Sequence, residues 1–314
     1  MHAGIRKAVV VLVALLIGCG LAVGQSDSET QLAKAIRAAQ STASSAGGRT
    51  NGVAWLRLAI LYQDAARYDD AEGAFRKAID LLKTQERARY ADALDRMGAM
   101  YVERGKFGKA VPLEQKALEI RQESKDAVGV GRSYMHLSLI AYGKHDLAGA
   151  EADAEMAVSL LAPEHPADGR DGGTPEEKMS ALIDLGLIRC ARGACDAATH
   201  DLECALRMAT ADYASNSVPV GFLHFLLGYA QNKSGDAEGG MSLMKCGIDE
   251  MKTQLGWGHP TYIAALKEYR AVLVKTGHGE EAGEVGESIA KLEHASGNAR
   301  NAGAVGLLGM NALR

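Results

Sequence analysis

Large apolar residues and small residues recur along residues 55–78 with the spacing of two packed helices. The first stretch reads Trp55-x2-Leu58-Ala59-x2-Tyr62, and the second reads Ala71-x3-Phe75-x2-Ala78. Residues three and four apart share one face of a helix, so each stretch predicts a helix with a single apolar face. The large residues of each helix match gaps left by small residues on the other. The segment therefore predicts an antiparallel helical hairpin.

The same template recurs five more times along the chain. Starting from Trp55, the equivalent positions fall at residues 94, 134, 182, 224 and 266, at intervals of 39, 40, 48, 42 and 42 residues. Self-similarity at such a period indicates a solenoid in which neighbouring repeats share one core. The copies are marked by Leu94, Met97, Gly98, Tyr101, Ala110 and Ala117; by Tyr134, Leu137, Ser138, Ala150 and Ala157; by Leu182, Leu185, Gly186, Ala198, Leu202 and Ala205; by Leu227, Gly228, Gly240 and Met244; and by Leu266, Tyr269, Ala282 and Ile289.

Turn and cap residues stand where the template requires helices to stop and restart. Four of the six copies have glycine in the slot between their two helices, which predicts that a left-handed residue ends the first helix. These glycines are Gly105, Gly193, Gly235 and Gly277. Before the fourth copy, Thr174-Pro175-x-Glu177 predicts a capping box with proline at the first helical position.

This pattern resembles the tetratricopeptide repeat. The period near 42, with Leu255-Gly256-Trp257-Gly258-His259-Pro260 leading into Tyr262, resembles the kinesin-light-chain type, and Pro163-Glu164-His165-Pro166 resembles a degraded copy of that joint. The resemblance covers roughly residues 52–293. It implies an all-α, right-handed superhelical solenoid of about six antiparallel helix hairpins whose partner is a protein or peptide.

The rest of the chain divides around this array. We expect a signal peptide at residues 1–24, an N-terminal helix that caps the first hairpin at 25–48, the solenoid at 49–294 and a flexible tail at 295–314. The apolar run from Ala8 to Ile17, preceded by Arg6 and Lys7, is typical of a secretory signal. It is too short to span a membrane, and no longer apolar run exists, so we expect no transmembrane domain.

Two cleavage schemes compete at the end of this signal. Ala22-Val23-Gly24 before Gln25 fits ordinary signal peptidase, which would release a periplasmic or secreted protein. Leu16-Ile17-Gly18-Cys19 resembles the bacterial lipobox, in which Cys19 becomes a lipidated membrane anchor. The apolar residues after Cys19 favour the first scheme.

The first helices of stacked hairpins usually line a concave binding groove. We expect groove-facing side chains one, five and eight places after the first large position of each copy. These slots are apolar through the middle of the array, which would suit an amphipathic helix or a hydrophobic peptide. The alternative is that the same side chains pack between neighbouring first helices. The candidate groove residues are Met135, Leu139, Tyr142, Ile183, Leu187, Phe225 and Tyr229.

The chain departs from the kinesin-light-chain pattern at one position of the first helix. Family members usually carry asparagine there, where its amide can bind a peptide backbone. The matching residues in this chain are Arg57, Arg96, His136, Asp184, Leu226 and Glu268. The resemblance therefore does not carry over the family's mode of peptide binding.

Four cysteines remain after export. Cys190 ends the first helix of the fourth hairpin and Cys195 opens the second, so they face each other across the turn and are the favoured disulfide pair in an oxidising compartment. Cys204 and Cys246 read as buried or half-buried small hydrophobes. His200 and Cys204 lie four residues apart, but no further ligand completes a metal site there.

No other chemistry emerges from the residues. The chain has 35 Lys and Arg against 39 Asp and Glu, so it lacks the basic footprint of a nucleic-acid-binding protein. No catalytic or phosphate-binding motif occurs, and His165 and His259 read as helix caps within the loop motif. We therefore expect no enzyme activity, no cofactor and no metal. The sequence favours an exported interaction scaffold, with a lipid-anchored envelope assembly factor as the alternative.

Overall fold

The structure of the protein, a computed structural model, describes residues 25–45, 49–162, 172–215, 217–255 and 259–301. All regular secondary structure in these ranges is helical, which confirms the predicted all-α class. The helices are α2 (Gln25–Ser45), α3 (Arg49–Asp64), α4 (Tyr68–Gln85), α5 (Arg87–Glu103), α6 (Phe107–Glu123), α7 (Ala127–Gly143), α8 (Leu147–Leu161), α9 (Pro175–Ala191), α10 (Cys195–Asp212), α11 (Val218–Ser234), α12 (Ala237–Leu255), α13 (Pro260–Lys275) and α14 (Gly279–Asn301).

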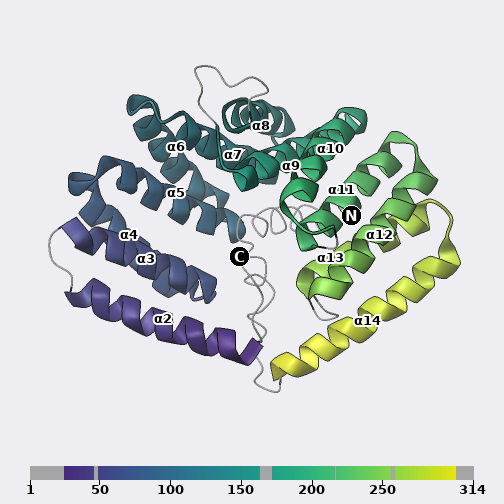
Figure 1. Cartoon of the computed structure of the whole chain (residues 1–314), viewed down its shortest axis with the longest axis horizontal. Coiled ribbons are helices and arrows are strands. Elements are labelled where there is room, and N and C mark those ends of the chain that lie inside the picture. Colours follow the sequence, from purple (N-terminus) through teal and green to yellow (C-terminus); the bar gives the residue numbers. More distant parts are fainter. Residues whose placement is uncertain (1–24, 46–48, 163–171, 216, 256–258, 302–314) are drawn as a thin grey trace. The chain divides into compact units, whose positions relative to one another are not determined.

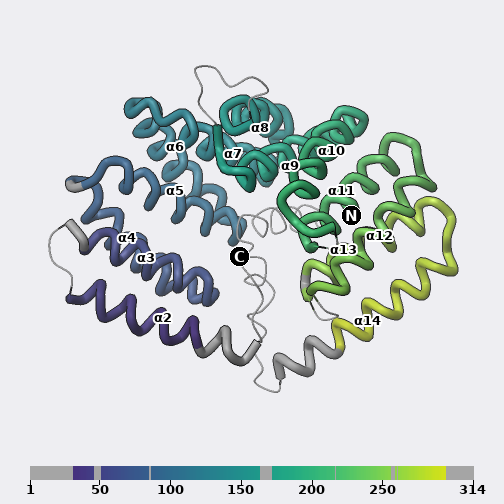
Figure 2. Tube along the Cα trace, viewed as in Figure 1, coloured from purple at the N-terminus to yellow at the C-terminus, as the bar shows by residue number. Residues whose placement is uncertain are grey.

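Helices α3 to α14 pair in order into the six predicted hairpins, which Figure 2 allows the reader to follow along the Cα trace. In the first hairpin, Ala59 of α3 and Ala71, Phe75 and Ala78 of α4 are fully buried. The small residues let the two helices approach, and the large ones fill the space between them. The template read from the sequence is thus the packing pattern of the hairpin.

The hairpin turns use left-handed residues, as predicted from their glycines. Gly105, Gly193, Gly235 and Gly277 all have positive φ, between 66° and 116°. Ala66 and His145 take the same conformation, with φ of 52° and 70°, in the two turns that lack glycine. A left-handed residue with a side chain is strained relative to glycine, so the turn geometry is a property of the repeat and not of the glycine alone.

The predicted caps are present on two helices. Thr174 and Glu177 form a reciprocal capping box at the start of α9, with the Thr174 backbone N–H donating to Glu177 Oε2 at 2.8 Å. His259 Nδ1 accepts a hydrogen bond of 3.2 Å from the backbone N–H of Thr261 at the start of α13. Burial lowers the pKa of His259 to about 4, so the ring stays neutral and able to accept this bond at neutral pH.

The chain forms two compact units, which we treat separately: the N-terminal unit (residues 20–173) and the C-terminal unit (residues 174–314). In the N-terminal unit, α3 contacts α5 and α5 contacts α7; in the C-terminal unit, α9 contacts α11. Contacts between successive first helices recur in this way, and Figure 1 shows each stack of hairpins. The first helices α3, α5 and α7 of the N-terminal unit therefore form one continuous layer.

Helix α2 packs along α3 at the start of the N-terminal unit. Ile36, Ala39 and Ala43 are buried against it, and Gln40 Nε2 donates a hydrogen bond of 2.6 Å to the Tyr62 hydroxyl. The outer face of the first hairpin is thereby covered, which is the role of a capping helix in a repeat array.

Several predictions fall outside the described residues. These are the signal peptide at 1–24 with both cleavage schemes and Cys19, the Pro163–Pro166 joint with His165, the Gly256–Gly258 part of the second joint, and residues 302–314 of the tail. Among the helices that the structure describes, none is both long enough and apolar enough to cross a membrane.

Candidate functional site

The apolar groove predicted from the sequence is largely filled by the protein itself. Six of its seven candidate residues are buried, and only Tyr229 is half-buried, with Lys233 Nζ above its ring at 5.4 Å. In the N-terminal unit the buried residues are Met135, Leu139 and Tyr142; in the C-terminal unit they are Ile183, Leu187 and Phe225. Positions one and eight of the template point into the contacts between neighbouring helices. The expected apolar groove is therefore corrected: these side chains form core.

In the N-terminal unit the accessible side of α3 and α5 keeps position five of the template but replaces positions one and eight by positions two and nine. In each copy, the residue two places before the first large residue and the residues two, five and nine places after it lie on one side of the first helix. We call this surface the first-helix face; none of its residues on α3 and α5 is buried. Its members are Val53, Arg57, Ile60 and Asp64 of α3, Asp92, Arg96, Ala99 and Glu103 of α5, and Arg132 and His136 of α7.

Arg57 and Arg96 stand out on the first-helix face. Both occupy the position where the resembling family carries asparagine, both are exposed, and neither guanidinium has an ion-pair partner among the described residues. The third member of the series, His136, turns inward, and its side chain is only 12% exposed. The first-helix face is thus polar where it is exposed, and at α7 its member His136 reaches the buried carboxylate of Asp95.

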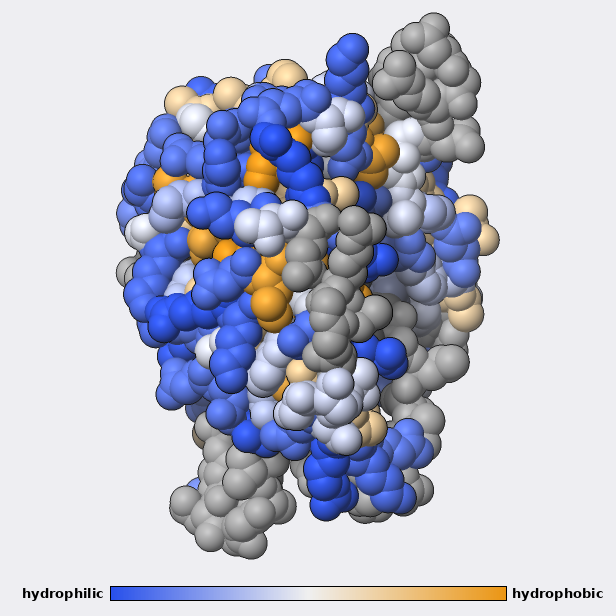
Figure 3. Space-filling model, turned by 90° about the vertical axis from the view of Figure 1, so that its left-hand side faces the viewer, coloured by the Kyte–Doolittle hydropathy of each residue, from blue (hydrophilic) through white to orange (hydrophobic). Residues whose placement is uncertain are grey.

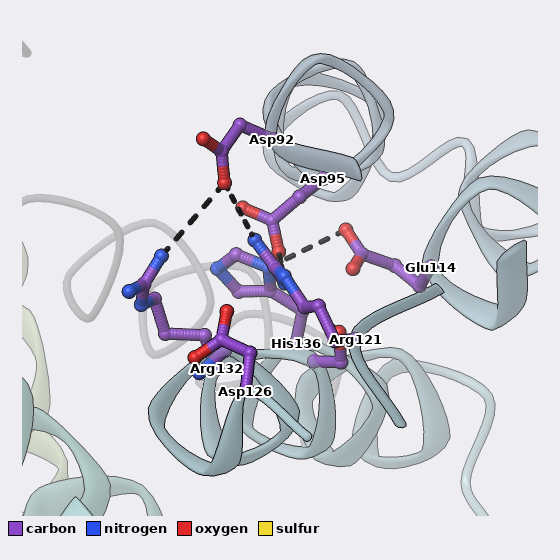
Figure 4. A network of polar contacts seen from close by, with 9 residues as sticks. Asp92, Asp95, Glu114, Arg121, Asp126, Arg132 and His136 are labelled. Carbon is purple, nitrogen blue, oxygen red and sulfur yellow. Dashed lines mark hydrogen bonds and ion pairs between the residues drawn. The ribbon is translucent and has the colours of Figure 1, made fainter. Parts of the chain in front are cut away.

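Beneath this face lies a group of ionisable side chains that we call the charge network: Asp92, Asp95, Glu114, Arg121, Arg132 and His136 (Figure 4). Arg121 Nη1 of α6 donates to Asp95 Oδ1 of α5 at 2.7 Å and to Ser133 Oγ of α7 at 2.9 Å. Its Nη2 donates to Asp92 Oδ1 at 3.2 Å. One guanidinium therefore joins three helices.

His136 lies between the two buried carboxylates of the charge network. Its Nδ1 is 3.2 Å from Asp95 Oδ1 and 3.3 Å from Glu114 Oε1, as ion pairs without good hydrogen-bond angles. Arg132 Nη1 lies 4.0 Å from Asp92 Oδ1 at the exposed edge. With every member ionised, three carboxylates balance three cationic groups, which is the condition for tolerating charge in a protein interior.

Burial and charge act in opposite directions on these groups. Burial alone would lower the pKa of His136, but Asp95 and Glu114 raise it to about 10. Burial raises the pKa of Glu114 to about 7, because the nearby cations only partly offset its loss of hydration. For Asp95 the cations His136 and Arg121 outweigh burial, and its pKa is lowered. Asp95 is therefore an anion and His136 a cation at neutral pH.

Two members of the charge network occupy positions that other hairpins fill with apolar residues. Glu114 matches Phe75 of the first hairpin, and Arg121 matches Leu82; Phe75, Leu82 and Glu114 are fully buried and Arg121 is 2% exposed. Gly98 of α5 makes room for Glu114, because a Cβ there would collide with the Glu114 carboxylate. Among the residues that the structure describes, no donor makes a well-formed hydrogen bond to either Glu114 oxygen.

The charge network holds helices α5, α6 and α7 together. Asp95, Glu114 and His136 bring three possible metal ligands within 4.8 Å of one another, but Arg121 already neutralises Asp95 from inside the same cluster. Its charges balance internally and Glu114 is fully buried, so substrate has no access to it. The network fixes the first-helix face from below.

The C-terminal unit holds all the cysteines that the structure describes. Cys190 and Cys195 form a disulfide across the turn at Gly193. Cys204 and Cys246 are free; Cys204 is half-buried, but Cys246 is exposed, contrary to the expectation of a buried hydrophobe. Arg207 Nη2 donates to Cys204 Sγ at 2.9 Å, and His200 Nε2 lies 3.8 Å from the same sulfur.

Sequence reasoning missed Glu114, Arg121 and the inward turn of His136. The signal was available in the template, since position 114 aligns with Phe75 and position 121 with Leu82. Charged residues at two core positions of one helix are a mark of a buried ion network. Only the structure, however, brings Asp95, Ser133 and His136 from two other helices to meet them.

Comparisons with known proteins agree with this architecture. Residues 50–123, which hold most of the first two hairpins, match a family model described as tetratricopeptide repeat. No curated protein matches the chain in sequence. On the face of the molecule shown in Figure 3, most side chains are hydrophilic and the hydrophobic ones gather in small spots between them.

Several solved structures share the fold. BtubC (BKLC) from P. vanneervenii is 17% identical with a TM-score of 0.57, over 75% of this chain and 94% of that chain. A putative kinesin light chain with nearly identical repeats from Podosopora anserina is 16% identical with a TM-score of 0.53, over 68% and 99%. A Rap protein complexed with competence and sporulation factor is 11% identical with a TM-score of 0.56, over 83% and 80%. At these identities the likeness is one of fold.

Proposed function

Because this chain is a tetratricopeptide repeat protein, we propose that it is an exported scaffold that binds a partner protein through the first-helix face of its N-terminal unit. The observation that carries the proposal is the continuous layer of α3, α5 and α7 with two exposed, unpaired arginines at one repeat position. Solenoids of stacked hairpins commonly bind other proteins along such a layer.

The chemistry of the first-helix face selects the kind of partner. Arg57 and Arg96 stand one hairpin apart on α3 and α5, which contact each other. An arginine fork binds carboxylates in two parallel hydrogen bonds. The partner segment is therefore acidic and extended along the array, in place of the hydrophobic peptide that the sequence suggested.

The charge network supports this role by holding the first-helix face rigid. Arg121 hydrogen bonds to residues of α5 and α7, so the two helices keep one spacing and angle. A surface that is organised before binding loses less conformational entropy on binding than a mobile one. The fixed position of α5, which carries Arg96, then contributes specificity as well as charge.

Two observations support export: the signal pattern at the N-terminus and the disulfide in the C-terminal unit. The Cys190–Cys195 bridge belongs in an oxidising compartment. The alternative, a lipid-anchored envelope assembly factor, needs Cys19 as its first residue. The intact mass of the mature protein distinguishes the two, because a free N-terminal Gln25 excludes the lipid anchor and a lipidated Cys19 supports it.

Site-specific crosslinking tests the binding surface in the native compartment. A photoreactive amino acid at position 57 or 96 should crosslink one partner band, and the same group at position 76, on the exposed side of α4, should not. The double variant Arg57→Glu and Arg96→Glu, carrying the photoreactive group at position 99 of the same face, should lose that band. Arg76→Glu with the same group at 99 should retain it. Equal crosslinking from positions 57, 96 and 76 would contradict the proposal.

A further inference from the structure

The hairpin formed by α11 and α12 in the C-terminal unit has unusually close helices. A Cβ on Gly228 would meet Gly240 O at 2.5 Å and Met244 N at 2.7 Å. A Cβ on Gly247 would meet Phe225 N at 2.6 Å. Backbone thus lies against backbone along the hairpin, and the sequence of glycines makes this approach possible.

This close approach brings three metal-ligating side chains together at the surface. His224 Nδ1 of α11 lies 2.8 Å from Glu250 Oε2 of α12, and Cys246 Sγ lies 3.9 Å from Glu250 Oε1. One donor atom from each of His224, Cys246 and Glu250 falls within 4.8 Å of the others. Cys246 and Glu250 are four residues apart, so they share one face of α12.

The distances match those that one small cation imposes on its ligands. Zinc binds sulfur at about 2.3 Å and imidazole nitrogen or carboxylate oxygen at about 2.0–2.2 Å, so two ligand atoms of a tetrahedral site lie about 3.3–3.7 Å apart. The Cys246–Glu250 distance of 3.9 Å is slightly longer than this, and the His224–Glu250 distance of 2.8 Å is about half an ångström shorter. Small side-chain movements would therefore seat the ion, which would replace the proton between His224 and Glu250.

The donor set also selects the metal. A thiolate, an imidazole and one carboxylate form a mixed soft and borderline set that suits zinc and disfavours calcium or magnesium, which require oxygen ligands. Among the described residues, Glu250 forms an ion pair only with His224, so no lysine or arginine competes for the carboxylate. Cys246 is exposed, which leaves water access to a fourth coordination position.

A second Cys–His pair in the same unit serves as an internal contrast. His200 and Cys204 are also four residues apart, with 3.8 Å between Nε2 and Sγ. There the third neighbour is Arg207, whose guanidinium donates to the sulfur at 2.9 Å. A fixed positive charge at the thiol opposes a cation, whereas the carboxylate of Glu250 attracts one.

We propose that His224, Cys246 and Glu250 form a three-ligand zinc site with a water molecule at the fourth position. Binding breaks the Cys246 S–H bond, forms the zinc–thiolate bond and releases that proton to solvent. The proton shared by His224 Nδ1 and Glu250 is also displaced, so His224 binds zinc through Nδ1 and keeps its proton on Nε2; no electron is transferred. The site lies on α11 and α12 of the C-terminal unit. It is independent of the partner surface proposed for the N-terminal unit.

The test is zinc binding by the full mature chain, reduced and without an affinity tag. We expect about one zinc per chain after desalting, and we expect cobalt, used as a spectroscopic probe, to give a thiolate-to-metal charge-transfer band. Each of Cys246→Ser, His224→Gln and Glu250→Gln should weaken zinc binding by more than the roughly 100-fold that loss of an outer-shell partner costs. The matched variants Cys204→Ser and His200→Gln should change it by less than about 3-fold, because Arg207 keeps that pair free of metal.

Folding is checked separately, so that a damaged variant is not mistaken for a ligand variant. The side chains of His224 and Glu250 are about one fifth exposed and Cys246 is exposed, so the metal-free variants should keep the helical circular dichroism spectrum of the native chain. Zinc should raise the Tm of the native chain and leave the Tm of the Cys246→Ser variant unchanged. Less than stoichiometric zinc in the native chain, or binding that survives all three ligand variants, would overturn the proposal.

Discussion

The first two hairpins of the N-terminal unit follow one template and fill it with opposite chemistry. The hairpin of α3 and α4 places Phe75 and Leu82 in its core, whereas the hairpin of α5 and α6 places Glu114 and Arg121 in the same two positions, buried to the same degree. The difference teaches that the repeat specifies where side chains go and how much room they have. It does not require those side chains to be apolar, provided that the neighbouring helices supply partners.

The two hairpins consequently depend on their neighbours in different ways. An apolar core contributes through buried area, which any well-fitting apolar surface supplies. The core of the second hairpin requires Ser133 and His136 of α7, because Arg121 and Glu114 meet them there. The second hairpin is therefore bound to the third by directional contacts.

The largest expected effect comes from replacing the same position in both hairpins by methionine. Arg121→Met removes the guanidinium that pairs with the buried Asp95, and should lower the free energy of unfolding by about 3–5 kcal/mol. Leu82→Met replaces one apolar residue by another of similar volume, and should cost less than about 1.5 kcal/mol. Urea denaturation of the two variants measures the difference. Equal losses would mean that Arg121 acts only as packing.

A second pair of substitutions should lower stability in the first hairpin but not in the second. Phe75→Leu shrinks a fully buried ring and should lower the free energy of unfolding by about 1–2 kcal/mol, chiefly through the cavity it leaves. Glu114→Leu removes a buried carboxyl whose oxygens find no hydrogen-bond donor among the described residues, while Asp95 still pairs with His136, so stability should be unchanged or higher by about 1 kcal/mol. Thermal unfolding compares them directly. A clear loss of stability in the Glu114→Leu variant would show that the His136 contact to Glu114 outweighs its burial.

The smallest expected effect is a dependence of stability on pH, which comes from His136 beside the second hairpin. The pKa of His136 is raised from 6.5 to about 10 in the folded protein, so its contribution is complete below pH 6.5 and is lost as the pH rises toward 10. Between about pH 6.5 and 8 the native chain should therefore lose about 1 kcal/mol more than a His136→Gln variant. Denaturation midpoints at both pH values give the comparison. If stability falls equally with pH in the two proteins, protonation of His136 does not contribute to the stability of the network.

Most of the fold followed from local rules in the sequence. The small and large positions around Trp55 and the glycines at positions 105, 193, 235 and 277 predict hairpins and their turns, because helix packing and left-handed turns depend on residue size and backbone freedom. The Thr174 capping box was equally local. The structure agrees with each of these.

The candidate site was harder, since its residues meet only in three dimensions. A shift of one residue turns a helical side chain by about 100°, so the slots of Met135 and Tyr142, at positions one and eight, appeared to face a groove when they face the core. The pairing of Arg121 with Asp95 spans two helices, and that of His224 with Glu250 depends on how closely α11 approaches α12. No spacing along the chain records either distance.

The contacts that Arg121 makes to α5 and α7 also bear on how similar hairpins stack in the correct order during folding. Apolar faces of similar repeats are interchangeable, so a hairpin can stack on the wrong neighbour while the chain folds, a known failure of repeat proteins. The hairpin that carries Asp95, Glu114 and Arg121 finds Ser133 and His136 only on α7. Another neighbour would leave Arg121 paired with Asp95 but would remove the His136 cation beside the buried Glu114, at a cost of several kcal/mol. The repeat that departs most from the template thus helps to fix the order in which the second and third hairpins stack.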